Sequence, residues 1–168
     1  MPTPSSQFAR ERTIRWDDPR ALAAAAHSMS GRHFLESILR GDLPLPPICR
    51  LVDFYFDQVD DGRVAMILEP NESHYNPIGT VHGGIIATAL DSVMGCAVHT
   101  KLHVGKAYTT LDLSVAYLRA ITIETGSLRV VGRARQTGRR AAFAEADITD
   151  SNGRALATAT STLLIMER

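Results

Sequence analysis

Residues 76–91 read Asn76-Pro-Ile-Gly-Thr-Val-His82-Gly83-Gly84-Ile-Ile-Ala-Thr-Ala-Leu-Asp91, and this stretch decides the fold. The glycine pair lets the backbone approach a ligand closely, and the first N–H groups of a helix beginning there lack intrahelical acceptors. Together with the positive end of the helix dipole, these N–H groups favour an oxyanion. Asp91 adds a carboxylate to the same helix. A donor turn combined with a carboxylate is what hydrolysis of an acyl group requires.

The second half of this stretch predicts one long helix that is buried along one side. Its apolar side chains recur every four positions in a stripe two residues wide: Ile85, Ile86, Ala89, Leu90, Val93, Met94, Ala97 and Val98. Asp91 lies off this stripe, on a face with small residues: Gly84, Ala87, Thr88 and Gly95. Such a face predicts close approach of another backbone or a slender ligand. The alternative is that Asp91 is an ordinary surface acid.

The remaining sequence predicts short helices first and strands afterwards. Asp17-Asp18-Pro19 marks the start of a helix over 21–27, and Gly41 ends a second helix over 30–40. Prolines at 44–47 favour extended chain, and residues 1–18 are expected to be loose. Strands are predicted at 50–58, 63–68, 108–118, 128–135, 141–148 and 155–166. Asp60-Asp61-Gly62 predicts a hairpin turn between the first two strands.

The strand at 108–118 is expected to be half-buried, because its side chains alternate in character. One face is predicted to carry Leu111, Leu113, Val115 and Tyr117, and the other Thr110, Asp112, Ser114 and Ala116. Short turns favour antiparallel neighbours. The sequence therefore predicts an α+β domain over 31–168, an antiparallel sheet wrapped around a long central helix, preceded by a partly helical extension over 1–30.

Composition limits the classes of partner. The chain has 168 residues, 45% of them hydrophobic, which is enough to bury one core. Eighteen basic and eighteen acidic residues give zero net charge, so nothing global attracts nucleic acid or an anionic membrane. The first residues lack the order of a signal peptide, and the alanines at 21–26 are too few to span a membrane. Cys49 and Cys96 are read as reduced thiols, so a cytoplasmic protein is expected.

Four segments together resemble the PaaI-like acyl-CoA thioesterases of the hotdog fold, across roughly residues 31–166: residues 76–91, 111–115, 117–119 and 137–140. The resemblance implies a thioester hydrolase in which Asn76 and the Gly83 amide hold the thioester carbonyl. Asp91 then activates water or attacks directly, and Thr110 assists it, although Thr109 is only one place away. It also implies homodimers or dimers of dimers with active sites at the subunit interface, an acyl-CoA substrate and no cofactor.

Other candidate residues have weaker signals. His82 fits an orienting role at the helix start better than a general base, because the helix dipole there disfavours its charged form. Gly84 and the turn of Gly138, Arg139 and Arg140 are candidate substrate contacts, with the arginines reaching coenzyme A phosphates; otherwise these arginines are solvated turn residues. Neighbouring histidines at 99 and 103 have a spacing known from zinc sites, but no acid completes a set, and no metal is predicted.

Two functions compete with an acyl-CoA thioesterase. A dehydratase of hydroxyacyl thioesters can share the fold, but it would need His82 to face Asp91 for proton transfer. A non-catalytic acyl-CoA-binding protein would keep the pocket without the acid, and the presence of Asp91 and Asn76 argues against it. Aromatic, medium-chain and polyketide-like acyl groups all remain compatible with the sequence.

Overall fold

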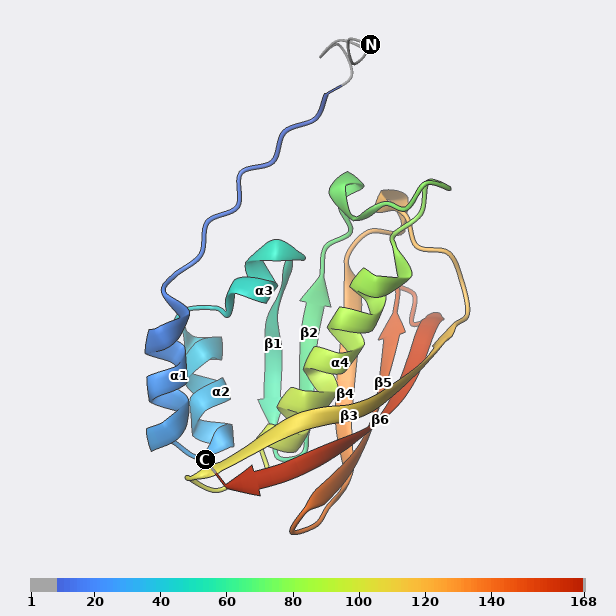
Figure 1. The fold of residues 1–168 in the computed structure, drawn as a ribbon. Coiled ribbons are helices and arrows are strands. Elements are labelled where there is room, and N and C mark those ends of the chain that lie inside the picture. The colour runs from blue at the N-terminus through green and yellow to red at the C-terminus, as the bar shows by residue number, and fades with distance from the viewer. Residues whose placement is uncertain (1–8, 168) are drawn as a thin grey trace, which may run out of the picture.

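A six-stranded antiparallel sheet curves around one long helix, and the predicted α+β architecture is confirmed (Figure 1). The computed structural model describes residues 9–167. The strands lie in the order β1-β2-β4-β5-β6-β3. Their bounds are β1 (Phe54–Asp60), β2 (Arg63–Leu68), β3 (Lys106–Tyr117), β4 (Leu128–Thr137), β5 (Ala141–Thr149) and β6 (Ala155–Glu167). β1 and β3 are therefore the two edge strands.

The helices begin and end close to the sequence signals. α1 (Pro19–Ser28) is capped by the Asp18 side chain, and α2 (Gly31–Arg40) begins at the cap Ser30 and ends at the left-handed Gly41. The predicted strand start at residue 50 is wrong, because a short helix, α3 (Pro47–Leu51), occupies that position. Proline suits the first position of a helix, so Pro47 starts α3 where extended chain was expected. The described residues also form the 3-10 helices η2 (Glu72–His74) and η3 (Ile123–Thr125).

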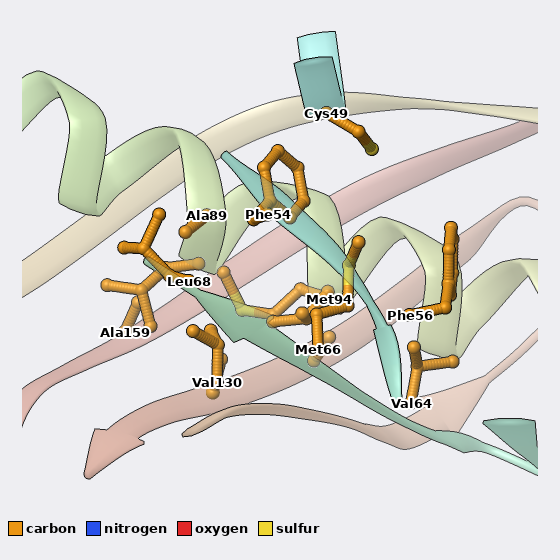
Figure 2. Packing of buried hydrophobic residues seen from close by; sticks show 14 of the residues in the cluster. Cys49, Phe54, Phe56, Val64, Met66, Leu68, Ala89, Met94, Val130 and Ala159 are labelled. Atoms are coloured by element: carbon orange, nitrogen blue, oxygen red, sulfur yellow. The ribbon is translucent and has the colours of Figure 1, made fainter. Parts of the chain in front are cut away.

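The central helix is α4 (Gly83–His99), and its apolar stripe fills the concave side of the sheet. Leu90, Val93 and Met94 are completely buried there. The helix lies very close to β4: a Cβ on Gly132 would be 2.3 Å from the Val93 carbonyl oxygen. Figure 2 shows Met94 of α4 beside Met66 of β2, with Phe54 and Phe56 of β1 around them. This core holds Asp91 at a fixed place over the sheet.

The strict alternation predicted for β3 is wrong, because the strand contains a bulge. The pairing of β3 with β6 shifts between Thr110 and Asp112, which leaves Leu111 unpaired and 60% exposed. A bulge reverses which side chains face each side of the sheet. Thr110 before the bulge and Tyr117 after it therefore both contact α4. β3 is also mostly exposed rather than half-buried.

The N-terminal segment is attached to the domain. Leu22 and Ala26 of α1 belong to the main hydrophobic core. Residues 9–18, expected to be loose, are extended, and Arg12 bonds Ser73 and Asp53. Residues 1–8 lie outside the described part. Within residues 9–167, no helix is long and apolar enough to cross a membrane.

Candidate functional site

Asn76 organises the turn that precedes α4. Its side-chain Oδ1 accepts the N–H groups of Ile78 and Thr80, at 3.1 and 3.2 Å, and its Nδ2 donates to Thr80 Oγ1 at 2.9 Å. Its own N–H donates to the Thr80 carbonyl at 2.8 Å. An amide nitrogen carries two donor hydrogens, and this turn uses one of them. Asn76 can therefore hold the turn and still offer an N–H to a ligand.

The start of α4 presents the amide of Gly83. His82 is the N-cap residue, and its Nδ1 accepts the Gly84 N–H at 2.9 Å. Its role in the reaction stays a prediction. Gly83 occupies the next position, where an N–H has no acceptor inside the helix. The Tyr117 hydroxyl donates to the Gly83 carbonyl at 3.0 Å, and a Cβ on Gly83 would be 3.2 Å from this ring. Only a glycine fits there without displacing the ring.

Asp91 lies in the middle of α4 and contacts β3. The Thr110 hydroxyl donates to Asp91 Oδ1 at 2.8 Å, whereas the neighbouring Thr109 is exposed. Thr110, and not Thr109, therefore contacts Asp91, and its assisting role stays a prediction. Asp91 also lines a cavity of about 220 Å³ whose other walls are mostly apolar: Pro46, Ile48, Cys49, Phe54, Phe56, Met66, Ser92, Cys96 and Tyr108. A carboxylate beside an apolar cavity suits an acyl group.

The donor turn, which carries Asn76 and the Gly83 amide, lies apart from the Asp91 carboxylate within one chain. Asn76 and Gly83 line a different cavity of about 300 Å³, which shares no residue with the cavity beside Asp91. Eight residues separate Gly83 from Asp91, which is roughly 12 Å along a helix axis. A single thioester carbonyl cannot contact both groups of the same protomer.

The arginine turn lies at the other end of α4. Arg139 and Arg140 are exposed between β4 and β5, and the Gly138 N–H closes the turn on the Ala141 carbonyl at 2.9 Å. Figure 1 shows this hairpin at the C-terminal end of α4, away from Gly83. The structure does not bring the two arginines to the donor turn of the same chain. Their contact with coenzyme A remains a prediction.

Three features of the site were missed because they depend on residues distant in sequence. Arg119 lines the donor cavity beside Gly83. The ring of Tyr108 covers Gly95, where an added Cβ would lie 2.7 Å from the ring. Gly95 is therefore small because of Tyr108, not because a partner or ligand approaches it there. The third feature is the η2 turn. The guanidinium of Arg12, more than sixty positions earlier in the sequence, donates a hydrogen bond to Ser73 Oγ of this turn.

The η2 turn supports the start of α4 through a buried histidine. His74 accepts the His82 N–H on its carbonyl at 2.8 Å and the Asn71 N–H on Nδ1 at 3.2 Å. Burial lowers the pKa of His74, although Asp53 nearby opposes this. A neutral His74 keeps Nδ1 available as an acceptor. The position of the donor turn thus depends on a buried, uncharged ring.

The two cysteines and the histidines at 99 and 103 are candidates for an alternative nucleophile or for metal ligands. Burial raises the pKa of both Cys49 and Cys96 to about 12, so neither thiol is ionised at neutral pH. His99 is buried between the rings of Phe34 and Tyr108, and His103 is exposed beyond the helix. Among residues 9–167, no three His, Cys, Asp or Glu side chains are grouped to hold a metal.

Comparison with known proteins finds similarity to thioesterases. The sequence model described as "Thioesterase superfamily" matches residues 78–157, which contain the start of α4, Asp91 and Thr110. This match covers just under half of the chain and is a similarity to that superfamily. Two proteins named acyl-coenzyme A thioesterase 13, from Homo sapiens and Pongo abelii, are 26% identical over 89 residues, 53% of this chain. The aligned part spans 62% of the length of these relatives.

Solved structures of the superfamily confirm the hotdog fold. A phenylacetic acid degradation-related protein from Ralstonia eutropha is 28% identical, with a TM-score of 0.71 over 77% of this chain and 98% of that one. A Streptococcus mutans protein solved with acetyl-CoA bound is 26% identical, with a TM-score of 0.62 over 68% of this chain and 90% of that one. The predicted relationship to PaaI-like proteins is thereby confirmed.

Proposed function

We propose that this protein is an acyl-CoA thioesterase, which hydrolyses the thioester to a free carboxylic acid and coenzyme A. The Asp91–Thr110 pair at the wall of an apolar cavity carries the proposal. The relatives support it, since the curated ones are named acyl-coenzyme A thioesterases and the Streptococcus mutans structure holds acetyl-CoA.

In the proposed reaction, the Asp91 carboxylate either removes a proton from the attacking water or attacks the thioester carbon itself. The Thr110 hydroxyl holds one carboxylate oxygen, which leaves the other free to react. The free N–H of Asn76 and the amide of Gly83 stabilise the oxyanion of the tetrahedral intermediate. One such donor contributes on the order of 3 kcal/mol in acyl-transfer sites. Coenzyme A departs as its thiolate.

Each active site is proposed to combine two protomers, with Asp91 from one and Asn76 and Gly83 from the other. The separation of roughly 12 Å along α4 within one chain supports this arrangement. β3 offers an edge with exposed apolar side chains, and such edges commonly pair: Leu111, Leu113, Tyr117 and Leu118. A symmetric homodimer, or a dimer of dimers, would place two α4 helices side by side.

Coenzyme A is proposed to be held by local contacts, because the chain has no net charge to attract it. If the two α4 helices run antiparallel, the Gly138–Arg140 turn of one protomer lies toward the donor turn of the other. Gly84 lies directly beside Gly83 and leaves room for the ligand. A cytoplasmic location completes the proposal and is supported by the two unpaired thiols.

A dehydratase is less consistent with the geometry. His82 Nδ1 is occupied by the Gly84 N–H, and the hydrogen bond to Asp91 comes from Thr110 rather than from a histidine.

The proposal is tested by thiol release from acyl-CoA substrates with the wild-type protein and the Asp91→Asn variant. The variant should lower kcat by at least about a hundredfold, the usual effect of losing a general base, while substrate binding is retained. Ser92→Ala is the matched control, because Ser92 lines the same cavity without a proposed role. Near-normal turnover by Asp91→Asn would show that Asp91 is not the reacting carboxylate.

A further inference from the structure

A second apolar cavity lies on the far side of Tyr108 from the Asp91 cavity. This groove has a volume of about 520 Å³ and runs between α1 and the beginning of β3. Leu22, Ala23 and Ala26 form its α1 wall, and Phe34 of α2 lies beside them. Figure 1 shows α1 and α2 next to each other at this edge of the domain.

The groove adjoins the Asp91 cavity. Pro46 and Tyr108 line both spaces. Thr110 lines the groove, and its hydroxyl is the one that donates to Asp91. The groove therefore lies between the Thr110 side of the proposed reaction centre and α1.

The lining of the groove suits a hydrocarbon. None of the described residues that line it is Asp, Glu, Lys or Arg, and apart from His99 and the threonines the lining is apolar. The Asp91 cavity, at about 220 Å³, lies below the range of about 300–1,000 Å³ typical of ligand pockets, whereas the groove lies within it. A flexible hydrocarbon chain fits a small cavity with a larger groove beside it better than a rigid ring system does.

Tyr108 has a fixed position between the two spaces. Its ring packs against Gly95 and lies 5.4 Å, centre to centre, from the ring of His99. A chain that leaves the Asp91 cavity must pass beside this ring. The position of this ring is therefore set by its packing against the core.

We propose that α1 forms the distal wall of the acyl site, so that the tail of a long-chain fatty acyl thioester passes Tyr108 and lies in the groove. Ala23 and Leu22 then set the longest chain that is accepted. This inference rests on the proposed thioesterase function and adds to it the substrate class and the role of α1.

The experiment compares Ala23→Trp with Ala24→Trp. Both alanines are exposed on α1, but only Ala23 lines the groove, so the second variant controls for the bulk of tryptophan. Thiol release is measured with butanoyl-CoA and dodecanoyl-CoA. Burying one methylene is expected to raise kcat/KM by about fourfold. Ala23→Trp should therefore lower kcat/KM for dodecanoyl-CoA by at least about tenfold, equivalent to the loss of two or more buried methylenes. Butanoyl-CoA should be unaffected, and Ala24→Trp should change neither.

Different results separate the groove from the thioesterase function. No thiol release by the wild-type protein from either substrate would overturn the proposed function, and the inference with it. Release from butanoyl-CoA with equal behaviour of the two variants on dodecanoyl-CoA would overturn the groove alone. Equal loss on both substrates, with a changed oligomeric state of Ala23→Trp by light scattering, would also overturn it, because a second protomer would then occupy the groove.

Discussion

The two halves of the candidate site are held in opposite ways. The donor turn is polar and local: Asn76 bonds residues within four positions of itself, and His82 caps the helix that it starts. The Asp91 cavity is apolar and assembled from α3, β1, β2, β3 and α4, with one side-chain hydrogen bond to the carboxylate. A turn built from neighbouring residues is determined by its own sequence. A cavity built from five elements is determined only by the complete fold.

In the Asp91 cavity, substitution of Thr110 is expected to lower kcat more than any other change except substitution of Asp91 itself, because Thr110 donates the hydrogen bond to its carboxylate. Thr110→Val keeps the shape but removes the hydroxyl, and a hydrogen bond to a charged group is worth about 1.5–3 kcal/mol. We expect kcat to fall by about tenfold or more in steady-state thiol-release kinetics. Thr109→Val, at the exposed neighbour, is the control and should stay close to wild type. Equal activities of the two variants would show that the Thr110 hydroxyl does not support the Asp91 carboxylate in the reaction.

Substitutions in the arginine turn are expected to have a smaller effect on catalysis. Within one chain this turn lines neither the donor cavity nor the Asp91 cavity. Exposed charge pairs contribute about 0.2–1 kcal/mol each, so Arg139→Ala combined with Arg140→Ala should raise KM for acyl-CoA by roughly threefold to tenfold. kcat should change little, because the lost binding is equal in the ground and transition states. The KM for an acyl-pantetheine, which lacks the nucleotide, should be the same for the variant and the wild-type protein.

Two other results have separate meanings for these arginines. Equal losses on acyl-CoA and acyl-pantetheine would indicate a role in folding or in the reaction centre. An unchanged KM for acyl-CoA would leave Arg139 and Arg140 as solvated turn residues. Arg119→Ala is a useful comparison, because Arg119 already lines the donor cavity of its own chain.

The same difference explains what the sequence could predict. The start of α4, the hairpin at Asp61-Gly62 and the caps Asp18, Ser30 and Gly41 follow from residues a few positions apart. Each of these signals acts through hydrogen bonds or φ values of the adjacent backbone.

Features that depend on distant contacts could not be predicted in this way. The bulge beside Thr110 follows from the pairing of β3 with β6. The helix α3 begins among prolines, which are also typical of extended chain, so the local sequence did not predict it. The fit of Tyr108 against Gly95 became visible only when strand and helix were placed together. The carboxylate was therefore found by its motif, but the cavity beside it was not.

The central claim, that the two halves come from different protomers, is tested most directly by heterodimers of two inactive chains. One chain carries Asp91→Ala. The other carries Asn76→Asp, which keeps an oxygen acceptor for the N–H groups of Ile78 and Thr80 but removes the donor. The heterodimers are isolated with two affinity tags and measured by thiol release.

In such a heterodimer, the account predicts one site with both defects and one intact site. Activity should therefore return to about half of the wild-type kcat per dimer, while each variant homodimer stays inactive. If verified heterodimers recover no activity, Asp91 and Asn76 act within the same chain, and the two-protomer site is contradicted.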